Sequence, residues 1–375
     1  MGRGLALRWA GALVVGGAVA CQVLAGIDDR TVADASLDDG GDGGLQPDGY
    51  DPCSSPNLPS APDQSTSSST DAVTFTAALS QVMLGNSDGG PYYGFNLDSK
   101  CTCPGPDSCH STSPDGGLDC DDPGSNGIDN YARRVFEQVN DVAKFVIDGG
   151  LITEAKFNQA LQSGISGVLI RVTSYNGQPN DAHVRVTVYA SQGFAGLPAA
   201  PAFDGGDYWT IDPSSASGQF NTDDAWVTDG TLVATNLNFP IVVGSAITQP
   251  VTIQLNDGII TAKLSLDASS NLVSMSGTLG GRWDPAKFLP SLQGVPDPLN
   301  NGQYLCGDSG TYQLLKLYIC QNRDINQSLS GDISGSCNAV SMGLDFVALP
   351  AHLGDAGASI VGPQPCGATW SDDCP

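Results

Sequence analysis

From Gly167 onward, apolar and polar residues alternate, which is the pattern of half-buried β-strands. The clearest pair is residues 168–173 and 183–189, joined by the turn-forming residues 176–181 of a hairpin. Further strands are predicted at residues 225–227, 231–235, 241–246, 251–255, 259–266 and 272–279. Short strands at this spacing, rich in valine, threonine and isoleucine, favour an antiparallel β-sandwich or jelly roll. We therefore expect a mainly β protein with a few helices, whose β-rich domain spans residues 167–375.

An amino-terminal helical, cysteine-rich subregion is predicted over residues 71–166. Its clearest helix carries apolar residues three and four apart on one face, and Asp129 can cap its start while Gly149 can end it. These apolar residues are Ile128, Tyr131, Val135, Val139, Val142 and Val146. Shorter helices are predicted at residues 153–161, 285–292 and 312–319.

The chain is strongly acidic, with 15 Lys+Arg against 40 Asp+Glu and a formal net charge of -25. All of the acids except Glu137 and Glu154 are aspartate. A nucleic-acid-binding protein needs a basic patch that neutralises phosphates, and this sequence offers none. Aspartate and the 47 glycines favour turns over helix interiors, which excludes a mostly helical fold.

Residues 1–20 have the organisation of a signal peptide. A basic start precedes an apolar run over residues 9–19, which is too short for a membrane-spanning helix. Ala18 and Ala20 satisfy the small-residue rule for cleavage, and Cys21 follows directly. This site resembles the lipobox of bacterial lipoproteins, which implies that the thiol of Cys21 carries a diacylglycerol. Leucine is usual in that family where Ala18 stands, and ordinary secretion without an anchor is the alternative.

Further segments resemble uncharacterised exported lipoproteins of myxobacterial type. One is Gln-Val-Leu-Ala-Gly-Ile-Asp-Asp-Arg directly after Cys21, and another is Tyr-Gly-Phe-Asn-Leu-Asp-Ser-Lys-Cys-Thr-Cys-Pro over residues 93–104. Asp-Cys-Asp at residues 119–121 and Gly-Ile-Asp-Asn at residues 127–130 continue the likeness. The resemblance implies export and a lipid anchor, at the outer membrane or cell surface of a Gram-negative bacterium. It implies no activity, because the family has none assigned.

Residues 21–70 form the expected lipid anchor and tether. Residues 31–70 are rich in Asp, Gly, Ser and Pro and contain no Lys or Arg. Such a segment buries too little apolar surface to offset the entropy of ordering it. We therefore expect a disordered spacer between the anchor and the folded part.

The 11 cysteines also favour an exported protein, because disulfides form in oxidising compartments. If Cys21 is acylated, an even number remains for pairing. We predict disulfide bonds among Cys53, Cys101, Cys103, Cys109, Cys120, Cys306, Cys320, Cys337, Cys366 and Cys374. Half of these lie before residue 167 and half after it, so at least one bridge joins the two regions. The pairing that we expect is Cys53 with Cys374.

An acidic loop before the first helix contains Asp119, Asp121, Asp122, Asn126 and Asp129. Carboxylate and amide oxygens in a loop with glycine are typical calcium ligands. The loop lacks the spacing of an EF-hand and its final glutamate. A calcium site and a solvated acidic loop whose Asp129 caps the helix are therefore both open. No other cofactor is indicated.

Four aromatic residues of the β-rich region could form a sugar-binding platform: Tyr208, Trp209, Trp226 and Trp283. In an alternating strand, a tryptophan can equally belong to the core. A surface platform would favour a glycan-binding protein, whereas buried rings would leave the ligand open.

No catalytic residue is predicted. Gly-Asp-Ser-Gly at residues 307–310 matches part of the chymotrypsin-like nucleophile signature, but the residues that follow it and the histidine motif of that family are absent. The alternative for Ser309 is a turn beside Cys306. We therefore expect a lipid-anchored envelope protein with a binding or structural role, whose partners are the membrane and a surface glycan or protein. The other hypothesis is a secreted hydrolase acting on polysaccharide or peptide.

Overall fold

The computed structural model describes residues 58–63, 73–85, 92–99, 109–110, 127–143, 153–243, 251–297, 299–300, 302–328, 335–358, 365–367 and 370–375. They belong to one compact unit that runs from Asp51 to Pro375. The predicted signal peptide, Cys21 and the tether apart from residues 58–63 lie outside the described residues. Among the residues described, no helix is long and apolar enough to cross a bilayer.

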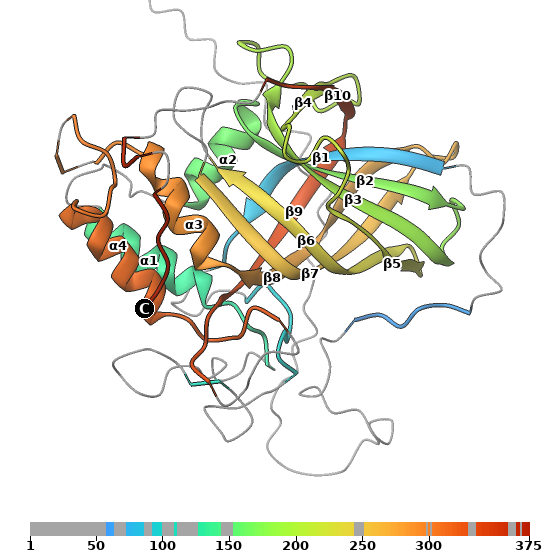
Figure 1. Ribbon diagram of the computed structural model, residues 1–375. Coiled ribbons are helices and arrows are strands. Elements are labelled where there is room, and N and C mark those ends of the chain that lie inside the picture. Colours follow the sequence, from blue (N-terminus) through green and yellow to red (C-terminus); the bar gives the residue numbers. More distant parts are fainter. Residues whose placement is uncertain are drawn as a thin grey trace, which may run out of the picture. The chain divides into compact units, whose positions relative to one another are not determined.

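Eight antiparallel strands close into a barrel (Figure 1). They are β1 (Val73–Met83), β2 (Gly167–Tyr175), β3 (Asp181–Phe194), β5 (Asn221–Thr228), β6 (Thr231–Val243), β7 (Val251–Leu266), β8 (Leu272–Trp283) and β9 (Val340–Pro350). The strand order is β3-β2-β1-β9-β8-β7-β6-β5, and the pairing of β5 with β3 closes the ring. Two short strands, β4 (Tyr208–Ile211) and β10 (His352–Ala356), extend the sheet from β3 outside the ring.

The predicted sandwich or jelly roll is therefore wrong, although a mainly β fold with helices is correct. Alternation shows that each strand buries one face. It does not show whether that face meets a second sheet or the opposite wall of the same sheet. Closure depends on β3, whose 14 residues pair with β2 along one edge and with both β4 and β5 along the other.

Alternation also missed β1 and β9, which lie side by side in the barrel. Ala77, Ala78 and Leu79 of β1 are all buried, and β9 begins with a run of buried residues, so neither strand alternates along its whole length. A register shift between Leu79 and Gln81 interrupts the pattern further. Because β1 comes from the region predicted as helical, elements from both sides of residue 167 belong to one barrel.

The strands β6 and β7 each merge two predicted strands into one. In both, the break in the sequence pattern is a register shift near a residue with positive φ, Asn236 in β6 and Asp257 in β7. Asn and Asp adopt positive φ more readily than most residues. Each strand therefore continues through its bulge.

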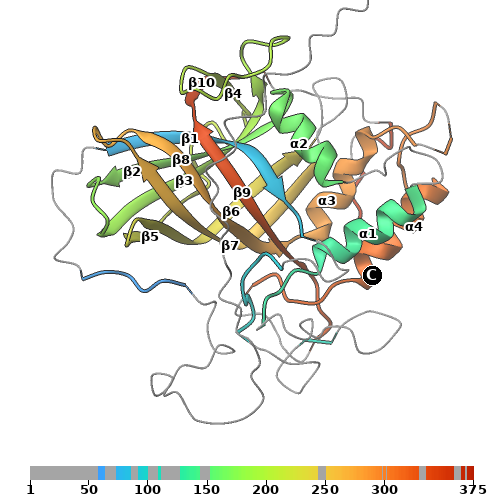
Figure 2. The same cartoon turned by 180° about the vertical axis from the view of Figure 1, so that it is seen from behind.

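In the described part, four helices match the four predicted positions. They are α1 (Ala132–Ala143), α2 (Glu154–Gln162), α3 (Pro285–Ser291) and α4 (Gly310–Gln321), with a 3-10 turn η2 (Leu292–Gly294) after α3. The side chains of Thr153 and Asp284 cap α2 and α3. Trp283, at the end of β8, packs against Phe136 of α1 and Phe288 of α3. These helices therefore cover the end of the barrel at which β8 finishes (Figure 2).

Disulfide bonds are present, which confirms that part of the prediction. The pairs are Cys109–Cys337, Cys306–Cys366 and Cys320–Cys374. The first of them joins the two sides of residue 167. The predicted bridge between Cys53 and Cys374 is wrong, because the sulfur of Cys374 is bonded to Cys320. The predicted disulfide cysteines that lie outside the described residues are Cys53, Cys101, Cys103 and Cys120.

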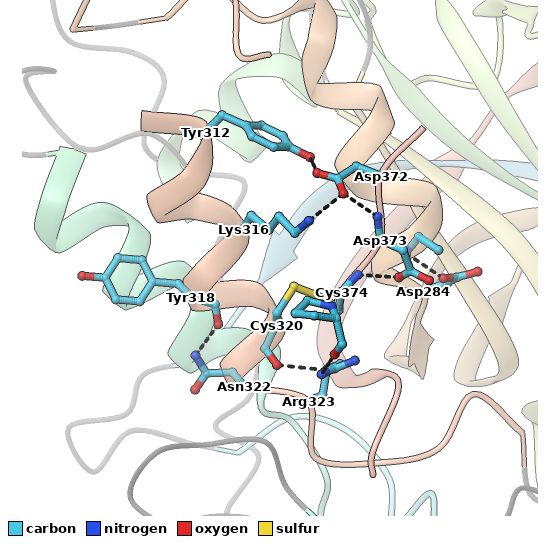
Figure 3. The surroundings of a disulfide bond; sticks show 12 residues. Asp284, Tyr312, Lys316, Tyr318, Cys320, Asn322, Arg323, Asp372, Asp373 and Cys374 are labelled. Carbon is cyan, nitrogen blue, oxygen red and sulfur yellow. Dashed lines mark hydrogen bonds and ion pairs between the residues drawn. A yellow bond between two sulfur atoms is a disulfide. The ribbon is translucent and has the colours of Figure 1, made fainter. Parts of the chain in front are cut away.

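The Cys320–Cys374 bridge holds the last residues of the chain against α4 (Figure 3). Asp372 accepts hydrogen bonds from the hydroxyl of Tyr312 and the ammonium of Lys316, both at 2.6 Å. Arg323 donates to the main-chain carbonyl of Pro375 at 3.0 Å. A covalent bond, an ion pair and hydrogen bonds therefore fix the carboxyl-terminal residues to this helix and to Arg323, which follows it.

Candidate functional site

One stretch of the barrel wall is incomplete, because β9 leaves the barrel at Pro350. β9 pairs with β1 only from Ala77 onward, and it pairs with β8 only from Met275 onward. In the described part of the chain, residues 73–75 of β1 therefore have no strand beside them on the side of β9, and the β7–β8 turn at residues 269–271 forms the other wall of the gap. We call this gap the notch, and it holds a pocket of about 700 Å³.

The path of the chain after β9 keeps the notch open. The amide of Ala351 donates to the carbonyl of Thr76 at 2.9 Å, and the amide of His352 donates to the carbonyl of Asp207 at 2.8 Å. From His352 the chain forms β10, which pairs in parallel with β4. The segment that follows β9 therefore pairs outside the ring and does not fill the wall.

Arg171 of β2 is the main charged group of the notch. Its neighbours Ile170 and Val172 are buried in the barrel core, so alternation directs Arg171 to the outer surface, opposite Thr76 of β1. Within the described part of the chain, its guanidinium makes no hydrogen bond or ion pair, and its Nε is buried. The pocket is otherwise lined largely by polar groups, which are Thr74, Thr76, Asp204, Ser269, Ser270, Asn271 and His352.

An aromatic pair lies at the border of the notch. The rings of Tyr208 and His352 stack with centroids 4.8 Å apart and planes 28° from parallel. The pairing of β4 with β10 brings these two residues together. Tyr208 is 54% exposed, and His352 lines the pocket. The notch therefore combines a cation, an aromatic surface and several hydroxyl and amide groups, which is the usual make-up of a ligand site.

The predicted aromatic platform does not exist as one surface. Trp209 and Trp283 are fully buried in two separate clusters of apolar residues. Trp226 is half-buried on β5, and its Nε1–H donates to the carbonyl of Pro59 at 3.0 Å. Only Tyr208 of the four lies at the notch. Trp209 follows Tyr208 directly, so the two rings point to opposite faces of β4.

Ser309 is a buried helix cap. Its hydroxyl donates to Asp297 at 2.7 Å and accepts the amide of Tyr312 at 3.1 Å. Burial alone would raise the pKa of Asp297, but hydrogen bonds from Asn300, Ser309, Leu299 and Thr311 lower it to about 2. The Gly-Asp-Ser-Gly sequence therefore positions the start of α4, and its serine has an ionised carboxylate as partner where a protease needs a histidine.

Of the predicted calcium ligands, only Asp129 is described, while Asp119, Asp121, Asp122 and Asn126 lie outside the described residues. The carboxylate of Asp129 accepts the amides of Leu97 at 2.5 Å and Asp98 at 3.2 Å. The described residues contain no group of three or more His, Cys, Asp or Glu side chains arranged to hold a metal ion. The calcium site therefore stays a prediction.

Two segments that carry the lipoprotein resemblance pack against each other and against the barrel. Phe95 forms an isolated antiparallel bridge with Asp129, and the side-chain Nδ2 of Asn130 donates to the main-chain carbonyls of Tyr93 and Gly343, both at 2.8 Å. A Cβ at Gly343 would collide with the carbonyl of Tyr93, so this contact requires glycine in β9. The described parts of both motifs thus have a structural role at the end of the barrel away from the notch.

A buried charged cluster lies beside these motifs. Arg282 is 2% exposed, donates to the carbonyls of Asn326 and Leu97, and lies 3.8 Å from a carboxylate oxygen of Asp257. Nearby, Asp324 accepts the amide of Ser341 at 2.8 Å and its hydroxyl at 2.5 Å. Burial raises the pKa of Asp324 to about 7, although these hydrogen bonds oppose the shift.

Sequence reasoning missed the notch residues Arg171, Asp204 and His352. Arg171 was open to detection, since it is the one charge inside the apolar run over residues 168–172. The other two come close to it only through the departure of β9, which no local pattern encodes. No protein-family model matches this chain, and the searches of curated proteins and of solved structures find no match.

Proposed function

We propose that this protein is a lipid-anchored binding module of a bacterial cell envelope, and that the notch is its ligand site. The observation that carries the proposal is Arg171, which has no partner among the described residues, in an open pocket beside the exposed Tyr208–His352 pair. A half-buried cation without a protein partner loses hydration and gains no compensating bond in the free protein. A ligand can supply that bond.

The hydrogen-bond partner of Ser309, the candidate nucleophile, favours a binding role over catalysis. A serine hydrolase needs a base within hydrogen-bond reach of the hydroxyl. Ser309 instead donates to a carboxylate whose pKa lies near 2, which is a poor base at neutral pH. The proposal therefore assigns Ser309 to structure and the notch to recognition.

Array screening of the full mature protein in detergent tests the binding site. Wild-type protein and the variants Tyr208→Ala and His352→Ala are applied to glycan and peptide arrays, with Leu317→Ala as a control that trims an exposed apolar side chain of α4. We expect a ligand set that both notch variants lose and the control keeps. Equal profiles for all four proteins would refute the notch as the site.

The anchor has a separate test. Replacing Cys21 by serine removes the thiol that the lipobox resemblance implies is acylated. We expect Cys21→Ser to move the protein from the membrane fraction to the soluble exported fraction and to abolish incorporation of labelled fatty acid. A protein that stays membrane-bound and unlabelled in both forms would contradict a lipid anchor at this position.

A further inference from the structure

We infer that the notch binds the carboxyl-terminal end of an extended peptide, which adds to the barrel wall as a short strand and pairs its carboxylate with Arg171. The inference rests on the proposed function, because it names the ligand class of the same site. Three features of the notch support it: its place in the barrel wall, its open edge on β1 and its arginine.

The notch continues the row that β9 occupies in the barrel wall. Over residues 345–348, β9 lies between β1 and β8 and pairs with both. Its last two residues, Leu349 and Pro350, still pair with β1, and the notch begins beyond them. There the pocket of about 700 Å³ lies between residues 73–75 of β1 and the β7–β8 turn at residues 269–271, and we expect it to take one extended chain.

The wall formed by β1 presents an open edge. Val73 and Phe75 pair with Tyr175 and Val172, so the extra residue of this bulge belongs to β2 and β1 itself is regular. The carbonyl of Thr76 points to the side of β9, since it accepts the amide of Ala351. By the two-residue period of a strand, the amide and carbonyl of Thr74 point to the same side, into the notch. Such an edge is a template for an added strand.

Arg171 can pair with a carboxylate, although the carboxylate of Asp204 also lines the pocket. Arg171 is the only lysine or arginine among the residues that line the pocket, and no described residue pairs with it. The planar guanidinium matches a carboxylate with two parallel hydrogen bonds. A peptide end supplies both the extended backbone and the anion, whereas a neutral glycan offers Arg171 hydrogen-bond acceptors but no counter-charge.

Fluorescence anisotropy with labelled hexapeptide pools tests the inference on the full mature protein in detergent. One pool has free carboxyl termini, a second has amidated termini, and a third is amidated but carries a glutamate at the last position. We expect the free-acid pool to bind and amidation to weaken binding by about tenfold or more, the usual effect of losing a charged hydrogen bond. Binding of the third pool at the strength of the first would overturn the assignment of a chain end.

Two variants separate the charge from the backbone. Arg171→Ala should weaken binding of the free-acid pool as much as amidation does. Binding of the amidated pool should be unchanged. Arg185→Ala is the matched control, since Arg185 lies on the outside of β3 and is already paired with Asp223 at 2.5 Å. Thr74→Pro removes the amide that points into the notch, so it should weaken both pools, while Thr74→Val should not. If Thr74→Pro does not fold, the Arg171 and amidation comparisons decide alone.

The outcomes also distinguish this inference from the proposed function. If glycans bind in a manner that depends on Tyr208 or Arg171 and no peptide pool binds, the proposed function holds and the peptide inference is wrong. If peptides bind but Arg171→Ala and amidation have no effect, the carboxylate pairing is wrong. If no array ligand and no peptide depends on any notch residue, both are wrong.

Discussion

Arg171 and Arg282 belong to the same barrel but have opposite surroundings. Arg282 is buried at the end covered by the lipoprotein-like motifs, where two carbonyls accept its hydrogen bonds and Asp257 lies close by. Arg171 lies at the notch, partly exposed, with no hydrogen bond or ion pair to the residues that the structure describes. A buried cation must be paired for the fold to be stable, whereas a cation at an open pocket contributes little to folding. The difference is what the proposed function expects if one end of the barrel serves stability and the other serves recognition.

The largest expected effect comes from exchanging these two arginines for alanine. Arg282→Ala leaves two carbonyls without their donor and removes the cation beside Asp257, so we expect the free energy of unfolding to fall by about 3–5 kcal/mol. Arg171→Ala should change it by less than about 0.5 kcal/mol. Urea denaturation of both variants measures these changes in the free energy of unfolding. Equal losses of stability would contradict the division between the two ends.

Asp324, which lies near Arg282, should make the stability of the fold depend on pH. Asp324 has a folded pKa of about 7 and an ordinary value of 3.8, so the folded state binds the extra proton between these limits. The contribution of Asp324 to stability should therefore be largest below about pH 4 and fall by a few kcal/mol as the pH rises to about 7. Asp324→Asn mimics the protonated form and should flatten this part of the profile. An unchanged slope in the variant would show that Asp324 is ionised in the folded state throughout.

Removing the Cys320–Cys374 bridge should have a smaller effect. The double variant Cys320→Ser with Cys374→Ser avoids a free thiol, and we expect it to lose about 2–4 kcal/mol. Thermal denaturation measures the loss, and carboxypeptidase digestion measures release of the residues that Asp372 and Arg323 otherwise hold. Peptide binding at the notch should not change, because the bridge fixes the chain end to α4. A change in binding would show that the two regions are coupled.

The smallest expected effect is that of Ser309→Ala. Loss of a helix cap costs about 1 kcal/mol, and the variant also removes one of the hydrogen bonds that keep the pKa of Asp297 low. NMR titration should therefore show the pKa of Asp297 rising from about 2. Binding at the notch should be unaffected. A hydrolytic activity present in the wild type and abolished in this variant would restore the hydrolase hypothesis.

The sequence predicted the local elements well and their assembly poorly. Spacing located all four helices, and alternation located β2, β3 and β8, because both patterns reflect which side of an element is buried. Closure of the barrel depends on the pairing of β3 with β5 and of β1 with β9, and these contacts join distant residues.

The site was harder to predict than the fold. Trp209 and Trp283 were predicted as ligand-binding residues because they are large and aromatic, but both side chains are buried in the core. Arg171 can be recognised in the sequence as a charge in an apolar strand. Its proposed role in binding, however, depends on the gap beyond the end of β9. A local pattern identifies an unusual residue and does not show what lies across from it.

The pairing of β1 with β9 also constrains how the protein can fold. The hydrogen bond from the hydroxyl of Ser80 to the carbonyl of Val347 joins residues 267 positions apart. Such distant contacts slow folding, because the chain must lose much of its entropy before they form. Until β9 emerges, β1 has a bare edge on one side, which invites aggregation. A chain stopped before Val340 therefore cannot form a smaller version of the barrel, and the first strand of the barrel is protected only after β9 has been made.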